Sequence, residues 1–293
     1  MNNTENYVSL VNEALDKYIE KKELIEKNLY SSMRYTLLAG GKRVRAALLL
    51  EFCRVCGGDV QKALPFACAI EMIHAYSLIH DDLPCMDDDV IRRGIPCNHI
   101  VYGEYMALLA GDALQSMAFD IMLSEKTVSA VGADRAARAA YILARACGAR
   151  GMVGGQVIDI MSERKRVDIN TLNDMYNKKT GALIIAAAEM GCILGGENEE
   201  KRKAASEYAS ALGLAFQIMD DILDVTSDSE TFGKVIGKDA SSQKSTYVST
   251  LGIEKSKEIV KDLTEISLNK LDCFETNTDY LRKLAMQLAS RNK

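Results

Sequence analysis

The stretch that decides the fold is ACAIEMIHAYSLIHDDLPCMDDD, residues 67–89. Its first part, residues 67–79, is a long apolar run that is typical of a buried helix. Five carboxylates then follow within the nine residues 81–89. The dipole of a helix disfavours negative charge at its C-terminus, so such a cluster needs a cation nearby. The stretch therefore indicates a core helix that ends in a cation-binding group.

Pro84 divides this first aspartate cluster. A proline cannot continue a helix without losing a backbone hydrogen bond. We therefore expect Asp81 and Asp82 near the helix end, with Asp87 returning from a following turn.

A second aspartate cluster, Asp220-Asp221-Ile222-Leu223-Asp224, follows the apolar run 212–219. Asp220 and Asp224 are four residues apart, so they share one face of a helix. Two carboxylates this close repel each other unless a cation or a proton lies between them. Hard oxygen ligands of this kind suit Mg²⁺, which also takes water and substrate phosphates. An acidic, solvated helix face explains one such cluster well, but it explains two clusters embedded in apolar helices poorly.

Helical periodicity extends along nearly the whole chain. Glycine pairs such as Gly57-Gly58 and Gly195-Gly196 punctuate the apolar runs, while strand-like alternation is not evident. We expect an all-α chain that forms one domain over residues 1–293, with about ten or more helices. The polar stretch 228–245 is expected to be a loop.

Composition limits the function. The 293 residues are 48% hydrophobic, which is enough for a sizeable core. The net charge of −5 argues against nucleic acid and anionic membranes as partners. The polar N-terminus does not resemble a signal peptide, and no run reaches the roughly 18 apolar residues of a membrane span. The close pair Cys53 and Cys56 is read as two small buried residues, so we expect reduced thiols and a cytoplasmic location.

Basic groups accompany the aspartates. Gly40-Gly41-Lys42-Arg43-Val44-Arg45 is a glycine turn that enters a helix with three cations, a plausible diphosphate cradle. Arg92-Arg93-Gly94 follows the first cluster directly, and Lys178-Lys179-Thr180-Gly181 is expected to be a basic turn before an apolar helix. Surface ion pairs are the simpler alternative. The arrangement fits two anion sites better. A metal ion would bridge one anion to the aspartates, and Lys42, Arg45 and Arg93 would hold the other anion directly.

These motifs resemble the trans-isoprenyl diphosphate synthases, and among them the bacterial-type farnesyl diphosphate synthases. The similar segments extend over residues 32–247 in the family's order. They include both aspartate motifs, the basic blocks above, Gly154-Gly155-Gln156 and Phe216-Gln217. The resemblance implies an all-α bundle around a central cavity (the isoprenoid synthase fold), a homodimer, and three Mg²⁺ ions, which Mn²⁺ can replace.

The resemblance also implies roles for individual residues. The expected metal ligands are Asp81, Asp82, Asp87, Asp220, Asp221 and Asp224, and the expected catalytic residues are Asp81, Asp82, Asp87, Lys179 and Asp220. Isopentenyl diphosphate is expected at Lys42, Arg45, His74 and Arg93. The allylic diphosphate is expected at Arg92, Lys179, Thr180, Gln217, Lys234 and Lys244.

Two of these assignments rest on more than the resemblance. A lone histidine on an apolar helix is usually a core residue, but His74 lies seven residues before Asp81 and therefore on nearly the same face. His80 is read as structural. Residues four and five before Asp81, Ser77 and Tyr76, are expected to line the tunnel for the growing product. A tyrosine there would form a bulky end to the tunnel, and with the four-residue spacer of the first aspartate motif the resemblance favours a fifteen-carbon product.

The sequence departs from the family at two positions. Cys97 stands where threonine is usual, and Ala46 replaces a common proline. Neither change removes a charged ligand.

The function expected is therefore the condensation of isopentenyl diphosphate with dimethylallyl or geranyl diphosphate to give farnesyl diphosphate. Geranyl and geranylgeranyl diphosphate are alternative products. A class I terpene cyclase is a further alternative, although it has no need of a second diphosphate site. The last alternative is a non-catalytic helical partner subunit, which would have no reason to keep both aspartate clusters.

Overall fold

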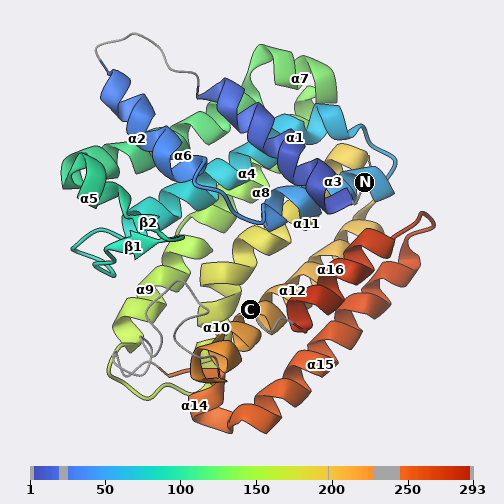
Figure 1. The fold of residues 1–293 in the computed structure, drawn as a ribbon. Coiled ribbons are helices and arrows are strands. Elements are labelled where there is room, and N and C mark those ends of the chain that lie inside the picture. The colour runs from blue at the N-terminus through green and yellow to red at the C-terminus, as the bar shows by residue number, and fades with distance from the viewer. Residues whose placement is uncertain (1–2, 20–25, 197, 227–244, 291–293) are drawn as a thin grey trace.

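The computed structural model describes residues 3–19, 26–196, 198–226 and 245–290. These residues are largely helical, as predicted, and the helices pack as a bundle (Figure 1). In the first half the helices are α1 (Asn3–Tyr18), α2 (Lys27–Leu37), α3 (Val44–Val55), α4 (Val60–Asp81), α5 (Asn98–Tyr102), α6 (Glu104–Leu123), α7 (Glu125–Val131) and α8 (Ala133–Cys147). In the second half they are α9 (Met152–Ser162), α10 (Ile169–Tyr176), α11 (Ala182–Gly195), α12 (Glu199–Thr226), α14 (Tyr247–Leu251), α15 (Ile253–Lys270) and α16 (Asp279–Ala289).

Three short elements interrupt the helices. A π-helix, η1 (Asn177–Gly181), joins α10 to α11, and a 3₁₀-helix, η2 (Leu271–Cys273), follows α15. The strands β1 (Ile91–Arg92) and β2 (Ile95–Pro96) form an antiparallel hairpin. The hairpin was not expected from the sequence, because two-residue strands carry no periodic pattern.

Helix α4 lies at the centre of the main core and packs against α1, α2, α3 and α6 (Figure 1). Its apolar residues face all sides, as the run at 67–79 predicted, because neighbouring helices cover it all round. It begins at Asp59, whose side chain accepts a hydrogen bond from the Gln61 amide (2.8 Å). It ends at Asp81, so the expected break before Pro84 is confirmed.

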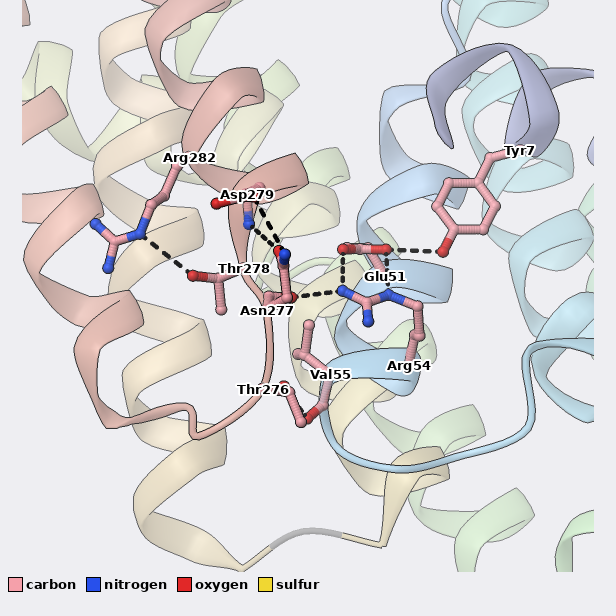
Figure 2. A network of polar contacts seen from close by, with 9 residues as sticks. All are labelled: Tyr7, Glu51, Arg54, Val55, Thr276, Asn277, Thr278, Asp279 and Arg282. Carbon is pink, nitrogen blue, oxygen red and sulfur yellow. Dashed lines mark hydrogen bonds and ion pairs between the residues drawn. The ribbon is translucent and has the colours of Figure 1, made fainter. Parts of the chain in front are cut away.

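The end of α3 is fastened to both ends of the chain (Figure 2). The buried Glu51 carboxylate accepts a hydrogen bond from the Tyr7 hydroxyl (2.7 Å) and forms an ion pair with Arg54 (2.7 Å). Arg54 also donates to the Asn277 carbonyl (2.6 Å). This network holds α1 and the segment before α16 against α3.

Two helices, α4 and α6, are long and apolar enough to cross a membrane by length and composition alone. Both helices contain charged residues, Glu71 in α4 and Asp112 in α6, so neither is an unbroken run of roughly 18 apolar residues, as the sequence led us to expect. In α4, 67% of the apolar window is buried within the protein, as in a core helix. In α6 only 39% is buried, so part of its apolar surface faces outward. One or two such helices are weak evidence for a membrane span.

Candidate active site

The first aspartate cluster has the predicted shape. Beyond Asp81 the chain turns, and the Asp87 amide donates a hydrogen bond to the Asp81 carbonyl (2.9 Å). This bond brings Asp87 back beside the end of α4. Asp88 adopts a left-handed conformation (φ 49°) and is exposed. The turn therefore separates carboxylates that face the protein from one that faces solvent.

Arg92, on the β1–β2 hairpin, neutralises part of this cluster. Its guanidinium lies 2.5 Å from Asp82 Oδ1 and 3.3 Å from Asp89 Oδ2. Asp82 is only 2% exposed, so its charge needs such a partner. The arginine expected to hold a diphosphate thus pairs with aspartates of the first cluster.

Asp81 carries an unfavourable charge in the folded protein. Burial raises its pKa from 3.8 to about 6; Lys179 opposes this effect, and the neighbouring Asp87 and Asp82 reinforce it. A buried carboxylate among other carboxylates is a good ligand for a cation, because the cation relieves both desolvation and repulsion. The influence of Lys179 also shows that η1 lies near the end of α4.

Lys179 lies on the π-helix η1, and its Nζ is 2.5 Å from Asp159 Oδ2 on α9. The expected basic turn at this position was therefore wrong: even Gly181 keeps right-handed helical angles (φ −64°, ψ −38°), so the chain continues as helix. Gly155 lets α9 approach, since a Cβ there would lie 2.2 Å from the Lys179 amide nitrogen. A π-turn at such a position is common at functional sites.

The next residue of η1, Thr180, donates a hydrogen bond to Gln217 Oε1 on α12 (3.0 Å). Two residues predicted to share a diphosphate are thus brought together. The contact also joins η1 to the helix that carries the second aspartate cluster.

The second cluster lies on one continuous helix, α12, and its side chains divide as the helical pitch requires. Asp220 and Asp224 are half-buried, as expected for one common face. Asp221 is 4% exposed and points toward α10 and α14. Its Oδ2 accepts hydrogen bonds from the Tyr176 hydroxyl (2.7 Å) and the Tyr247 amide (3.0 Å). Asp221 is thus anchored in the protein, while its role as a ligand stays a prediction.

Carboxylate oxygens from both clusters are the hard ligands that Mg²⁺ prefers. Within the described residues, no three His, Cys, Asp or Glu side chains approach closely enough to hold a metal by themselves. The chemistry of the donor set, which is carboxylate oxygen throughout, is what fits a hard cation such as Mg²⁺.

A group of cations lies on the other side of the first cluster, around His74. Burial lowers the pKa of His74 well below its ordinary value, and Arg45 and Arg93 lower it further. His74 is therefore neutral near pH 7, and the arginines provide the positive charge. Arg45 Nε is buried and has no hydrogen-bond partner among the described residues. An anion between these side chains would satisfy it.

The glycine turn before α3 supports this basic group. Gly40 (φ 85°) and Gly41 (φ 129°) adopt angles that other residues rarely adopt. Arg93 donates to the Gly40 carbonyl (2.5 Å), and a Cβ on Gly41 would lie 3.2 Å from the Arg93 guanidinium. The glycines thus let Arg93 lie directly on the turn.

The three cations after this turn have different environments, contrary to the single cradle that the sequence suggested. Arg43 turns inward and donates to the Leu37 carbonyl (2.6 Å), with Glu71 at 3.4 Å. It therefore stabilises the turn rather than facing a ligand. Arg45 faces the His74 group, and Lys42 is exposed. Lys234 and Lys244 lie outside the described residues.

The expected chain-length residues lie on α4. Tyr76 is 5% exposed, and its hydroxyl has no hydrogen-bond partner among the described residues. Its ring contacts His80 edge-on (5.7 Å between centroids). His80 is structural, as expected, because its Nε2 lies 3.0 Å from the Leu108 carbonyl. The Ser77 hydroxyl donates to the His74 carbonyl (2.9 Å).

Sequence reasoning missed several residues around the site. Asp159 pairs with Lys179, and its place three residues after Gln156, on the same helix face, was an available signal. Cys97 was noted only as a departure, yet its buried thiol hydrogen-bonds to Asp82, and burial raises its pKa to about 12. Tyr176 had no signal, since nothing local connects it to Asp221.

Comparisons with known proteins identify the family. The polyprenyl synthetase family model matches residues 26–282. The large subunit 1 of a heterodimeric geranylgeranyl pyrophosphate synthase from Arabidopsis thaliana is 44% identical over 97% of this chain and 75% of its own length. A dimethylallyltranstransferase from Fischerella ambigua is 46% identical over 90% of this chain and 76% of its own length.

A solved structure is similar throughout. The apo structure of a FPP/GFPP synthase from Zymomonas mobilis superimposes with a TM-score of 0.88 and 36% identity, over 98% of this chain and 97% of the other. Together with the family match, this similarity confirms the expected fold class. The chain belongs to the polyprenyl synthetase family and is a short-chain prenyltransferase.

Proposed function

We propose that the protein condenses isopentenyl diphosphate with dimethylallyl and then geranyl diphosphate to give farnesyl diphosphate. The observation that carries the fifteen-carbon product is Tyr76, a bulky buried side chain five residues before Asp81 on α4. Five residues of helix rise about 7.5 Å. A chain that grows from the aspartates along α4 would meet this ring.

Each of the two anion sites would hold one of the two diphosphate substrates. Asp81, Asp82, Asp87, Asp220, Asp221 and Asp224 would hold Mg²⁺, which when bound neutralises the charge of the departing diphosphate. Arg92 and Lys179 would leave their present carboxylate partners and bind the allylic diphosphate. Thr180 and Gln217 would provide neutral hydrogen bonds to it.

The second substrate would lie in the basic group. Arg45 and Arg93, with the exposed Lys42, would bind the diphosphate of isopentenyl diphosphate, and neutral His74 would donate a hydrogen bond. This placement would bring the nucleophilic double bond beside the allylic carbon, and the proximity of the two would accelerate the reaction.

The reaction then needs few protein groups. The allylic C–O bond breaks, and the isopentenyl double bond attacks the allylic carbon to form the new C–C bond. The tertiary cation that results then loses a proton from its neighbouring carbon, which restores a double bond. No side chain stands out as the base, and the departed diphosphate is a sufficient acceptor. The apolar residues of α4 would keep water from the cationic carbon.

The test is product size. The protein is incubated with Mg²⁺, labelled isopentenyl diphosphate and each allylic primer, and the dephosphorylated products are sized. We expect fifteen carbons for the parent protein and longer products for Tyr76→Ala. Tyr76→Phe is the matched control, because it keeps the ring, and it should still give fifteen carbons. An unchanged product in Tyr76→Ala would overturn the role of Tyr76.

Geranylgeranyl diphosphate is the second candidate product, because many of the similar proteins are named for it, including the Arabidopsis subunit. The same assay distinguishes the two. A twenty-carbon product from the parent protein would favour this candidate over farnesyl diphosphate.

We also propose that the chain acts as a homodimer. Apolar side chains are exposed on α5 and α6, among them Tyr105 (70% exposed), Leu109 and Val101. A second copy packed against this face would cover them. Light scattering should give a dimer for the parent protein and a monomer for Leu109→Glu. A parent protein that is monomeric at micromolar concentration would refute the dimer.

A further inference from the structure

Half of the eight cysteines gather at the end of the bundle where α3 finishes. Cys53 lies on the last turn of α3 and Cys56 directly follows it, while Cys192 lies on α11 and Cys273 on η2. Arg45 of the basic group is eleven residues from Cys56 along the same helix, about 16 Å. The thiols are therefore separate from the candidate active site.

Two of these thiols are in contact. The sulfurs of Cys56 and Cys192 are 3.7 Å apart, although 136 residues separate them in the sequence. A disulfide has an S–S distance of about 2.05 Å, so a small rotation of the two side chains would suffice.

The backbones of α3 and α11 approach closely around the pair. A Cβ on Gly191 would lie 2.4 Å from the Leu49 carbonyl oxygen, and one on Gly195 would lie 2.4 Å from Cys56 Cβ. The two glycines on either side of Cys192 thus let α11 press directly on α3. The close contact of the two helices keeps the two sulfurs near each other.

Cys53 is a poorer partner, although it lies only three residues from Cys56. Its thiol points to the Asp59 carbonyl oxygen (3.9 Å), and burial raises its pKa to about 12. Its thiol therefore contacts a backbone oxygen, whereas the thiol in contact with Cys192 is that of Cys56.

Cys273 offers an accessible thiol beside the buried pair. It is exposed, and its pKa is raised by burial and also by the nearby charge of Cys56. The next residue, Phe274, packs on Phe52 of α3 (5.8 Å between centroids). Thr276 donates to the Val55 carbonyl (2.7 Å; Figure 2). These contacts hold η2 over the end of α3.

We propose that Cys56 and Cys192 form a disulfide when the protein meets a low-molecular-weight disulfide, with Cys273 as the entry thiol. The Cys273 thiolate attacks the small disulfide and releases one small thiol. Cys56 then attacks the Cys273 sulfur and releases the second small thiol. Cys192 finally attacks the Cys56 sulfur and returns Cys273 as a thiol. Overall, two protein thiols are oxidised and one small disulfide is reduced to two thiols.

The new bond would join the end of α3 to α11 and close a long loop. Cross-linking residues so far apart in the sequence restricts the unfolded chain strongly. We therefore expect the oxidised protein to have a melting temperature several degrees above that of the reduced protein.

The experiment uses oxidised glutathione on the folded parent protein, followed by thiol blocking and non-reducing tryptic mapping. Cleavage after Arg54 places Cys53 and Cys56 on different peptides, so the partner of Cys192 is identified directly. We expect residues 55–62 linked to residues 180–201. Glutathione attached to Cys273 without that linked pair would overturn the proposal.

Variants test the route. Cys192→Ser should abolish the linked peptide and the rise in melting temperature, while Cys53→Ala should retain both. Cys273→Ser should slow the formation of the bond at least tenfold. An unchanged rate in Cys273→Ser would remove Cys273 from the route.

Discussion

The two aspartate clusters are built in different ways. The first gathers Asp81, Asp82 and Asp87 around a turn that ends α4, and the charges of Arg92 and Lys179 reach it from the hairpin and η1. The second lies on the continuous helix α12, where the pitch alone places Asp220 and Asp224 on one face.

This difference indicates how each cluster responds to ligands. In the first, the partners of the carboxylates are the same cations that are expected to bind diphosphate, so substrate and metal must exchange with existing ion pairs. In the second, Tyr176 and Tyr247 hold Asp221 with neutral donors, which no substrate needs to displace. If the proposed roles hold, we expect ion pairs of the first cluster to exchange when substrate binds, while the hydrogen bonds that anchor Asp221 are kept.

The largest expected effect is on turnover. Asp81→Ala and Asp220→Ala should each lower kcat by about 10³-fold, because each removes a carboxylate proposed to hold the Mg²⁺ that neutralises the departing diphosphate. The matched control is Asp88→Asn, an exposed residue whose left-handed angles asparagine tolerates. Steady-state incorporation of labelled isopentenyl diphosphate at saturating Mg²⁺ measures all three. A loss below tenfold in either alanine variant would contradict an equal role for the clusters.

The next effect concerns the ion pair at the first cluster. Arg92→Ala leaves the buried Asp82 charge without its partner, so the free energy of unfolding of the metal-free protein should fall by about 3 kcal/mol. Arg92→Lys, which keeps the charge, should lose less. Urea unfolding with a chelator measures both variants, and equal stability of Arg92→Ala and the parent would refute the pairing.

The pH dependence of stability is a third distinction. The pKa of Asp81 is raised to about 6, so the folded state binds its proton more tightly than the unfolded state does. Its destabilising charge is present above pH 6 and disappears as the pH falls toward 4. Asp81→Asn should therefore stabilise the metal-free protein by up to about 3 kcal/mol at pH 8 and hardly at pH 4.

Urea unfolding at the two pH values, with chelator present, measures this difference. Asp220→Asn is the comparison from the second cluster. If Asp81→Asn raises the free energy of unfolding equally at both pH values, the buried charge of Asp81 is not the cause of the stabilisation.

The smallest effect is expected at the anchor of the second cluster. Tyr176→Phe removes one donor to the buried Asp221 carboxylate and should cost about 2 kcal/mol of stability. Since Asp221 keeps the Tyr247 amide, kcat should fall less than tenfold. The control is Tyr208→Phe. The Tyr208 hydroxyl donates a hydrogen bond to the carbonyl of Leu281, a residue far along the chain from both clusters. A large kcat loss in Tyr176→Phe with unchanged stability would mean that Asp221 is not anchored in this way.

Features set by local sequence were predictable. The apolar run at 67–79 and Pro84 determine where α4 ends, and the four-residue spacing determines that Asp220 and Asp224 share a face. Each depends only on helical pitch or on a missing amide hydrogen, which are properties of a short segment.

Features set by tertiary contact were not predictable. Arg43 and Arg45 look alike in the sequence, and only the packing of α3 on α4 directs one to Glu71 and the other toward His74. The π-helix at Lys179 likewise depends on the close approach of Gly155 from α9. Such arrangements depend on contacts between two segments, so the sequence of neither segment alone predicts them.

The central claim is that one protein joins two diphosphates with Mg²⁺ and stops at fifteen carbons. The most direct measurement incubates it with labelled isopentenyl diphosphate and geranyl diphosphate, with and without Mg²⁺, and sizes the dephosphorylated product. We expect Mg²⁺-dependent incorporation of one label into a fifteen-carbon alcohol. Release of unlabelled hydrocarbon without incorporation, or no reaction at all, would contradict the claim.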